Sequence, residues 1–299
     1  GRVRVTFLGR EDEHRPWILS APAGDVVPAF VDHRPGTAAD DLVAAVHATE
    51  PDAVVAFAPH ELSGEALAET GALTLAIVER TFAPGIDDVW HPGAELPAAP
   101  ALPAGYDRVL TTDPLLARAA GAWRSAPLPV DDARFVAAPS AGHELRAVFA
   151  GQETDWRRYW LPRATEHYGL RRLRADEIAT AAFADATVGL CLREADGQPG
   201  FPATALLHLA AGHLLITEPL RPVRGLEPGL DHLEVREPLE LLHVLHQVRR
   251  RPAAFEHIRL RGRARMELYR ASVVWPRVLA DLAADVAAYG RPATRAPSA

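Results

Sequence analysis

Short apolar segments alternate with amphipathic segments along the first half of the chain. Residues 3–9, 53–58 and 73–78 are largely apolar runs, which are typical of strands buried on both faces of a parallel sheet. Residues 38–49 and 62–70 carry apolar side chains at helical spacing. The order strand, helix, strand, helix, strand therefore predicts a doubly wound parallel sheet.

The same alternation starts again in the second half of the chain. The predicted strands there are residues 145–150, 170–173, 187–192 and 213–217, and the predicted helices are residues 155–168, 175–183, 201–211, 237–250, 252–269 and 273–289. A Pro-rich stretch at 83–103 and a polar gap at 140–144 read as connecting segments.

The predicted fold class is therefore α/β, with two Rossmann-like αβα domains that face each other across a cleft. We expect an N-terminal domain over residues 1–138, a C-terminal domain over 139–272, and a last helix with a frayed tail over 273–299. Ligands of such folds bind at the carboxyl ends of the strands.

Composition excludes several kinds of chemistry. The chain contains no lysine, so all 32 of its Lys and Arg cations are arginines, and neither lysine Schiff bases nor a P-loop lysine is possible. A single cysteine excludes a disulfide scaffold. The net charge of −7 argues against a generally basic nucleic-acid binder, and we expect no nucleic-acid partner. No apolar run is as long as a membrane helix, and we expect a cytoplasmic protein without a transmembrane segment.

The segment from 196 to 217 offers a candidate anion site. A Gly-rich loop with Gly200, Phe201 and Pro202 leads into the predicted helix, and Thr204 adds a hydroxyl. Unpaired N–H groups at the start of a helix bind phosphate well. The alternative interpretation is an ordinary loop–helix–strand unit of an αβα domain.

These residues resemble the donor-binding element of GT-B glycosyltransferases. The sequence is most similar to the CgeB-like group, which is related to the family-1-like C-terminal domain. The resemblance rests on Gly200-Phe201-Pro202 with the helix end Leu207-His208-Leu209-Ala210-Ala211-Gly212, on Phe149-Ala150-Gly151 followed by Arg157 or Arg158, and on the run at 225–238; it covers residues 105–285. It implies a nucleotide-sugar donor in the C-terminal domain and an acceptor, of a kind that we cannot name, in the N-terminal domain. It also implies that the last helix returns to the N-terminal domain.

One departure from the family pattern concerns the ribose. The resemblance places a ribose-binding glutamate in the helix at the position that Leu207 occupies here. Either another residue holds the ribose, the donor differs, or the chain does not catalyse. The main hypothesis is therefore a metal-independent glycosyltransferase without a cofactor, using a UDP-, GDP- or dTDP-sugar. The alternatives are a non-catalytic binding or scaffold protein and a nucleotide-sugar epimerase.

Candidate site residues follow the ends of the predicted strands. Without lysine, diphosphate charge has to be met by arginines, so Gly151, Arg157, Arg158 and Arg193 join the loop residues as donor-binding candidates. For the general base, acidic and histidine side chains follow the first three strands, at residues 11–14, 60–61 and 79, and we select Asp12, His60 and Glu79.

Other charged and histidine residues receive structural interpretations. The alternative interpretation of Arg193 is an exposed pair with its neighbour Glu194, and we expect the arginines from Arg259 to Arg270 to form a solvated face. His208 is expected to pack. His243 and His246 lack a third ligand nearby, so no metal site is predicted.

Overall fold

The protein is described by a computed structural model that covers residues 1–57, 59–79, 101–136, 144–174, 177–178, 180–194 and 200–292. These residues form two compact units. The first unit contains the described residues up to Asp132 together with those from Arg270 onward, and the second contains residues 133–269. The domain boundary that the sequence predicts, after residue 138, lies outside the described residues, as does most of the Pro-rich stretch.

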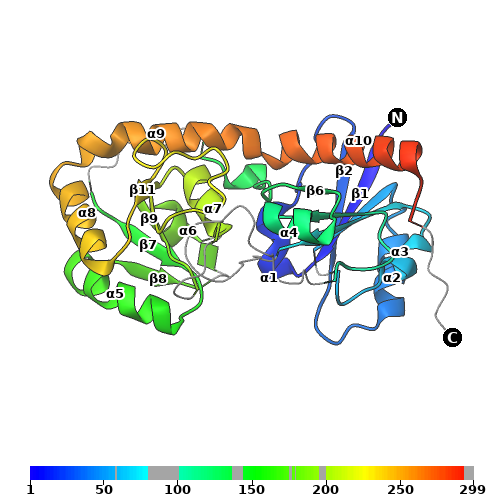
Figure 1. The fold of residues 1–299 in the computed structure, drawn as a ribbon, viewed down its shortest axis with the longest axis horizontal. Coiled ribbons are helices and arrows are strands. Elements are labelled where there is room, and N and C mark those ends of the chain that lie inside the picture. Colours follow the sequence, from blue (N-terminus) through cyan, green and yellow to red (C-terminus); the bar gives the residue numbers. More distant parts are fainter. Residues whose placement is uncertain are drawn as a thin grey trace. The chain divides into compact units, whose positions relative to one another are not determined.

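The first unit is built on a six-stranded parallel sheet (Figure 1). Its strands are β1 (Val3–Gly9), β2 (Val26–Asp32), β3 (Ala53–Ala56), β4 (Leu73–Val78), β5 (Arg108–Thr111) and β6 (Arg124–Ser125), in the spatial order β2-β1-β3-β4-β5-β6. The chain changes direction across the sheet between β1 and β3, and doubly wound sheets bind their ligands at the carboxyl ends of such a strand pair. The edge strand β2 was not predicted, because Pro28 interrupts its apolar run; an edge position tolerates proline.

Helices cover both faces of the first sheet. The helical segments are α1 (Glu11–His14), η1 (Arg15–Trp17), α2 (Ala39–His47), α3 (Gly64–Ala68), α4 (Pro114–Ala120) and α10 (Ala271–Tyr289), with η2 (Asp132–Arg134) where the chain leaves the unit. Neighbouring residues of a strand point to opposite faces. Leu8 of β1 packs in one cluster with Leu42 of α2 and Leu116 of α4.

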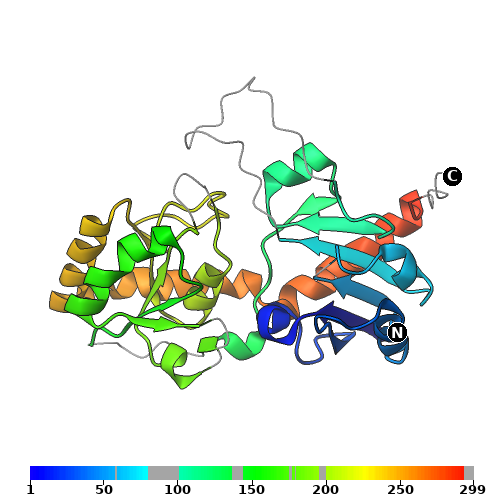
Figure 2. The ribbon, with the colours of Figure 1, turned by 90° about the horizontal axis from the view of Figure 1, so that it is seen from below.

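The last helix completes the other face of the first sheet (Figure 2). The fully buried Trp275 of α10 lies edge-on to Phe7 of β1, with ring centroids 5.1 Å apart. Its indole N–H donates to the backbone oxygen of Trp17 at 3.0 Å. Helix α10 is thus part of the core of the first unit.

The second unit contains a five-stranded parallel sheet. Its strands are β7 (Ala147–Ala150), β8 (Arg171–Leu173), β9 (Val188–Cys191), β10 (Leu214–Thr217) and β11 (Leu233–Glu234), in the order β11-β10-β9-β7-β8. The change of direction lies between β7 and β9, so the crevice of this sheet is at the carboxyl ends of those strands. The predicted fold class, two parallel α/β sheets with Rossmann-like order, is confirmed.

The helices of the second unit are α5 (Asp155–Tyr168), α6 (Ala181–Ala184), α7 (Thr204–Ala210), α8 (Pro238–Arg250), η4 (Pro252–Phe255), α9 (Glu256–Arg265) and η5 (Met266–Tyr269). Trp160 of α5 and Leu241 of α8 pack on Phe149 and Leu190 of one sheet face. The predicted helix 201–211 is shorter than expected, because α7 begins at Thr204, and the predicted helix 252–269 is divided into η4, α9 and η5. The predicted helix 175–183 lies partly outside the described residues, and α6 forms its end. No helix among the described residues is long and apolar enough to cross a membrane.

The arginines of α9 correct one prediction. Arg259 and Arg263 are buried, not part of a solvated face. Arg259 donates to the backbone oxygen of Gly212 at 3.0 Å, and Arg263 donates to that of Val136 at 2.6 Å. Their guanidinium groups therefore tie α9 to the rest of the second unit.

Candidate functional site

Acidic and histidine side chains gather at the carboxyl edge of the first sheet. They come from α1 directly after β1, from the end of β2, and from the segments that follow β3 and β4: Glu11, Asp12, Glu13, His14, Asp32, His33, Glu61 and Glu79. The parallel sheet brings together segments that are far apart in the sequence. The carboxyl edge is where doubly wound sheets bind their ligands.

His14 is held in one orientation over this edge. The backbone N–H of Arg10 donates to Nδ1 of His14 at 2.8 Å, so the neutral ring carries its proton on Nε2. The ring stacks on Phe57, the residue that follows β3, at 5.1 Å and 26°. Gly9 makes room for it, since a Cβ there would be 2.9 Å from Nδ1. Burial lowers the pKa of His14, which keeps the imidazole uncharged near neutral pH.

Glu79 is the carboxylate that faces this histidine. Its Oε1 lies 3.8 Å from Nε2 of His14, and 33% of its side chain is exposed. Loss of hydration, together with the negative charge of Glu13, raises the pKa of Glu79 to about 7. A neutral His14 does not counteract this shift. The carboxylate is thus poised to exchange a proton near neutral pH.

A second histidine–glutamate pair lies at the same edge. Nε2 of the buried His33 lies 3.3 Å from Oε2 of Glu61, and the guanidinium group of Arg10 contacts both Glu61 and Glu13. The sequence analysis did not single out His33. It directly follows β2, the strand that was missed, so no strand end drew attention to it.

The three predicted catalytic residues differ in their surroundings. Glu79 belongs to the pair with His14. Asp12 is exposed on α1, and its charge only partly offsets the lowering of the His14 pKa by burial. His60 is exposed after β3. The structure therefore places Glu79, rather than Asp12 or His60, in contact with a second candidate group.

In the second unit, Arg157 joins the segments that follow β7 and β9. Its guanidinium group donates to the backbone oxygens of Gln152 at 2.8 Å, Leu192 at 3.0 Å and Arg193 at 3.0 Å. It also lies over the ring of Phe149. Burial lowers the pKa of Arg157. Gly151, at the end of β7, lies beside it with a φ of 155°.

Arg158 and Arg193 have carboxylate partners. Arg158 is exposed and pairs with Asp155 one helical turn earlier. Arg193 pairs with Glu218, at the end of β10, whereas the alternative interpretation of the sequence had paired it with its neighbour Glu194. Glu218 is only 2% exposed. Glu218 was not predicted as a site residue, although it is an acidic residue directly after a buried strand, the same signal that pointed to Glu79.

The predicted anion loop leads into α7, which is a helix of only seven residues. The N–H groups of Ala205 and Leu206 already donate to backbone oxygens within the turn, at 2.9 and 3.0 Å. The hydroxyl of Thr204 lies 3.3 Å from the sulfur of Cys191. These contacts direct the start of α7 toward β9. Three loop residues that the sequence predicts to bind the anion are half-buried: Gly200, Phe201 and Pro202.

Two neighbouring residues of α7 are buried in the core: Leu207, which stands where the resemblance places a ribose-binding glutamate, and His208. Leu207 is 2% exposed. His208 is fully buried, and its Nδ1 lies 2.9 Å from Nδ1 of His213. His208 thus packs, as expected.

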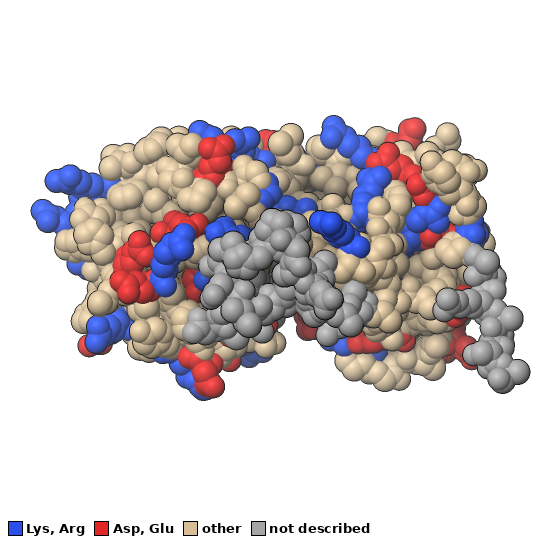
Figure 3. All heavy atoms as spheres, in the orientation of Figure 1, with Lys and Arg blue, Asp and Glu red and all other residues tan. Residues whose placement is uncertain are grey.

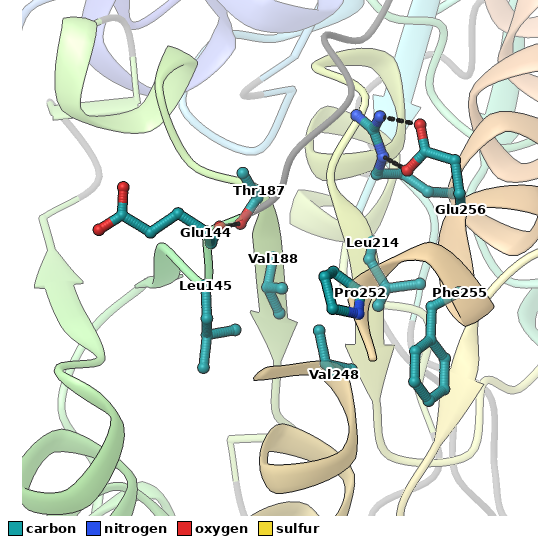
Figure 4. A pocket seen from close by; sticks show the side chains of 10 residues that line it. Glu144, Leu145, Thr187, Val188, Leu214, Val248, Pro252, Phe255 and Glu256 are labelled. Carbon is teal, nitrogen blue, oxygen red and sulfur yellow. Dashed lines mark hydrogen bonds and ion pairs between the residues drawn. The ribbon is translucent and has the colours of Figure 1, made fainter. Parts of the chain in front are cut away.

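A small pocket opens at the opposite edge of the second sheet (Figure 4). Val188 and Leu214, the first residues of β9 and β10, line it together with Val248, Pro252 and Phe255. In Figure 4 the apolar side chains turn toward one another, and the Glu256–Arg259 pair lies at one side. No described candidate from the sequence lines this pocket, which lies at the amino ends of the strands, away from the catalytic edge expected for this fold.

Charged side chains of both signs are interspersed on the face of the molecule seen in Figure 3.

Within the described part of the chain, no group of three or more His, Cys, Asp or Glu residues could hold a metal ion.

Comparison with known proteins shows a likeness in fold. No family model matches the sequence, and no curated protein matches it. Anabaena HepE, solved with UDP-glucose, superimposes with a TM-score of 0.56 at 11% identity, over 95% of this chain and all of that one. AviGT4, a glycosyltransferase involved in avilamycin A biosynthesis, gives 0.54 at 13% identity, over 95% of this chain and 98% of that one.

A third neighbour carries a different activity in its name. A putative UDP-N-acetylglucosamine 2-epimerase from Listeria monocytogenes superimposes with a TM-score of 0.50 at 10% identity, over 98% of this chain and 99% of that one. Together these likenesses show that the chain has the GT-B fold, as its sequence resemblance implied.

Proposed function

We propose that this protein is a glycosyltransferase that moves a sugar from a nucleotide-sugar donor to a hydroxyl group of an acceptor. The observation that carries the proposal is the His14–Glu79 pair at the carboxyl edge of the first sheet. A carboxylate with a pKa of about 7 is matched to the task of a general base at neutral pH. The fold of the chain and its sequence resemblance to the CgeB-like group support the same activity.

In this reaction Glu79 accepts the proton of the acceptor hydroxyl. The acceptor oxygen then forms a bond to the anomeric carbon of the sugar, and the bond from that carbon to the nucleoside diphosphate breaks, so that the diphosphate leaves with the electron pair. His14 lies beside this carboxylate, with Nε2 3.8 Å from Oε1, and because its ring is neutral it does not lower the pKa of Glu79. Because the ring holds its proton on Nε2, His14 is not itself the base.

The donor is proposed to bind to the second unit. Anabaena HepE was solved with UDP-glucose, which supports a nucleotide sugar, and a UDP-sugar in particular. We propose that arginine side chains of this chain stabilise the leaving diphosphate without a metal ion or other cofactor.

Two other functions have an observation in their favour. The likeness to the putative epimerase supports a nucleotide-sugar epimerase. The burial of Leu207, where the family resemblance expects a ribose-binding glutamate, supports a binding protein without catalysis. An epimerase and a transferase both bind nucleotide sugars, whereas they differ in whether free diphosphate is released.

A thermal-shift series with UDP, GDP and dTDP tests the proposal, with uridine, guanosine and thymidine as matched controls. We expect saturable stabilisation by one diphosphate, of about 2.7 kcal/mol at 100 times its Kd. The uncharged nucleosides should stabilise the protein far less. The absence of stabilisation by any nucleotide would contradict both the transferase and the epimerase.

A further inference from the structure

Residue 193, at the carboxyl end of β9, is fixed from several sides by buried charged groups. We infer that Glu218 and Trp156 are positioning residues that hold the guanidinium group of Arg193 ready for the diphosphate of the donor. This inference rests on the proposed function, and it names which arginine meets the phosphates.

Glu218 contacts both the backbone and the side chain of Arg193. The backbone N–H of Arg193 donates to Oε2 of Glu218 at 2.7 Å, and Nε of Arg193 lies 3.2 Å from Oε1. The indole N–H of Trp156, in the first turn of α5, is shared between the two carboxylate oxygens at 3.1 and 3.2 Å. Both oxygens of Glu218 therefore already have donors, so this carboxylate orients its neighbours and does not replace the ribose-binding glutamate.

Arg157 holds the same residue from the carbonyl side. Its Nε donates to the backbone oxygen of Arg193, and its Nη2 donates to that of Leu192. A third hydrogen bond runs from Arg157 to the backbone oxygen of Gln152. The guanidinium group therefore donates to backbone oxygens that follow both β7 and β9. Arg157 was a candidate for binding phosphate, but this geometry makes it a second support of Arg193.

The cost of this arrangement points to a role beyond folding. Glu218 and Arg157 are 2% and 7% exposed, and burying such ions usually gains no stability over apolar side chains of similar size. Functional sites, in contrast, need side chains whose orientation is fixed by their surroundings. The side chain of Arg193 is 15% exposed, so it still reaches the surface at the edge where doubly wound sheets bind ligands.

The chemistry of the ligand follows from the residue type. A guanidinium group recognises phosphate oxygens with directed hydrogen bonds, and this chain has no lysine to do so. Arg158, the other candidate of α5, is exposed, and its partner Asp155 is exposed as well, so no buried group fixes its orientation. Of the three arginines that the sequence predicts to bind the donor, Arg193 is therefore the one whose side chain contacts a buried carboxylate and still reaches the surface at this edge.

The test measures the Kd of UDP and the Kd of uridine, by NMR titration, for the wild-type protein and for the Glu218→Gln variant. Glutamine keeps the size of the side chain but removes the charge that orients Arg193. We expect the Kd for UDP to rise about tenfold, or 1.4 kcal/mol, with less than a twofold change for uridine. Trp156→Phe keeps an aromatic side chain but removes the indole N–H donor, and it should raise the Kd for UDP about threefold.

Glu256→Gln is the matched control, because Glu256 pairs with the buried Arg259 on α9, at the other edge of the unit. It should leave both affinities unchanged. The double variant Glu218→Gln, Arg193→Gln should have a Kd for UDP close to that of the weaker single variant, because the two residues act as one unit.

Two results would overturn the inference while leaving the proposed function standing. One is a wild-type protein that binds UDP while Glu218→Gln and Trp156→Phe bind it equally well. The other is an equal loss of UDP and uridine binding in these variants, which would mean that they disturb the unit as a whole. If Glu218→Gln does not fold, Trp156→Phe alone decides. A wild-type protein that binds no nucleotide contradicts the proposed function itself and this inference with it.

Discussion

The Nε2 atom of His14 lies 3.8 Å from Oε1 of Glu79, although 65 positions separate them in the chain. They meet because β1 and β4 lie in one parallel sheet with β3 between them. His14 stays neutral through burial, and Glu79 has a pKa of about 7 for the same reason. Each shift supports the other, because a charged imidazole would pull the pKa of the carboxyl group down.

Replacing Glu79 by Gln should stabilise the protein at pH 8 and should do so much less at pH 5. The pKa of Glu79 rises from 4.5 to about 7 on folding, so the carboxylate opposes folding once the pH passes 4.5, and fully so above 7. Since a third of the side chain is exposed, we expect a gain of about 1 kcal/mol at pH 8. Urea unfolding at both pH values measures it.

Asp12→Asn, an exposed change on the neighbouring helix, is the control for the loss of one negative charge. An equal gain in Asp12→Asn, or a gain in Glu79→Gln that is as large at pH 5, would show that Glu79 does not carry the raised pKa.

The strands at the centre of each sheet could be predicted from the sequence, because they are largely apolar. Strands β1 and β4 coincide with the predicted segments 3–9 and 73–78. The edge strand β2 was missed because it contains Pro28 and is only half-buried. A run of apolar residues indicates a buried strand, and an edge strand is less buried than a central one.

The candidate site could be predicted only in part. The ends of strands pointed to Glu79 and Arg193, but the pairing of Glu79 with His14, and of Arg193 with Glu218, depends on strand order, which periodicity does not reveal. For the same reason, the sequence could not distinguish Arg259, whose charge is satisfied by a buried carbonyl, from an arginine on a solvated helix face.

Gly189→Ala should be strongly destabilising. A Cβ on Gly189 of β9 would lie 2.2 Å from Nδ1 of His208, and the buried ring has no space to withdraw. We expect a loss of about 3 kcal/mol in the free energy of unfolding. Gly200→Ala is the matched control, because a Cβ there would meet no atom within 4 Å. If both variants melt alike, His208 does not pack on β9 as described.

The buried His208–His213 pair should make the protein sensitive to acid. Burial lowers the pKa of His208 well below its usual value and that of His213 to about 4. Because the unfolded chain takes up protons at these residues below about pH 6.5, stability falls as the pH drops, by up to about 1.4 kcal/mol per pH unit for each histidine.

The variant with both histidines replaced by Leu should lose part of this slope between pH 6.5 and 4.5, while His257→Gln, at an exposed position, should keep all of it. Unfolding curves at several pH values provide the comparison. A double variant as acid-sensitive as the wild-type protein would rule out the pair as the source.

Trp275→Ala should destabilise the first unit. The indole of Trp275 fills the face of the sheet against Phe7 and donates to the backbone oxygen of Trp17. Truncation of a buried aromatic side chain costs about 3–5 kcal/mol. Tyr289→Ala, at the exposed end of the same helix, should change stability by less than about 0.5 kcal/mol. Equal melting temperatures for the two variants would mean that α10 is not part of this core.

Turnover of nucleotide sugars, followed by NMR in the presence of a mixed pool of hydroxylated acceptors, tests the central claim most directly. We expect the wild-type protein to release free nucleoside diphosphate from one sugar nucleotide, at a rate that rises with pH up to about 7 and then levels off. Glu79→Gln should lose about 10²–10⁴-fold in rate, as expected for a general base. Conversion of the donor into an isomeric nucleotide sugar without free diphosphate, or an equal rate in Glu79→Gln, would contradict the account.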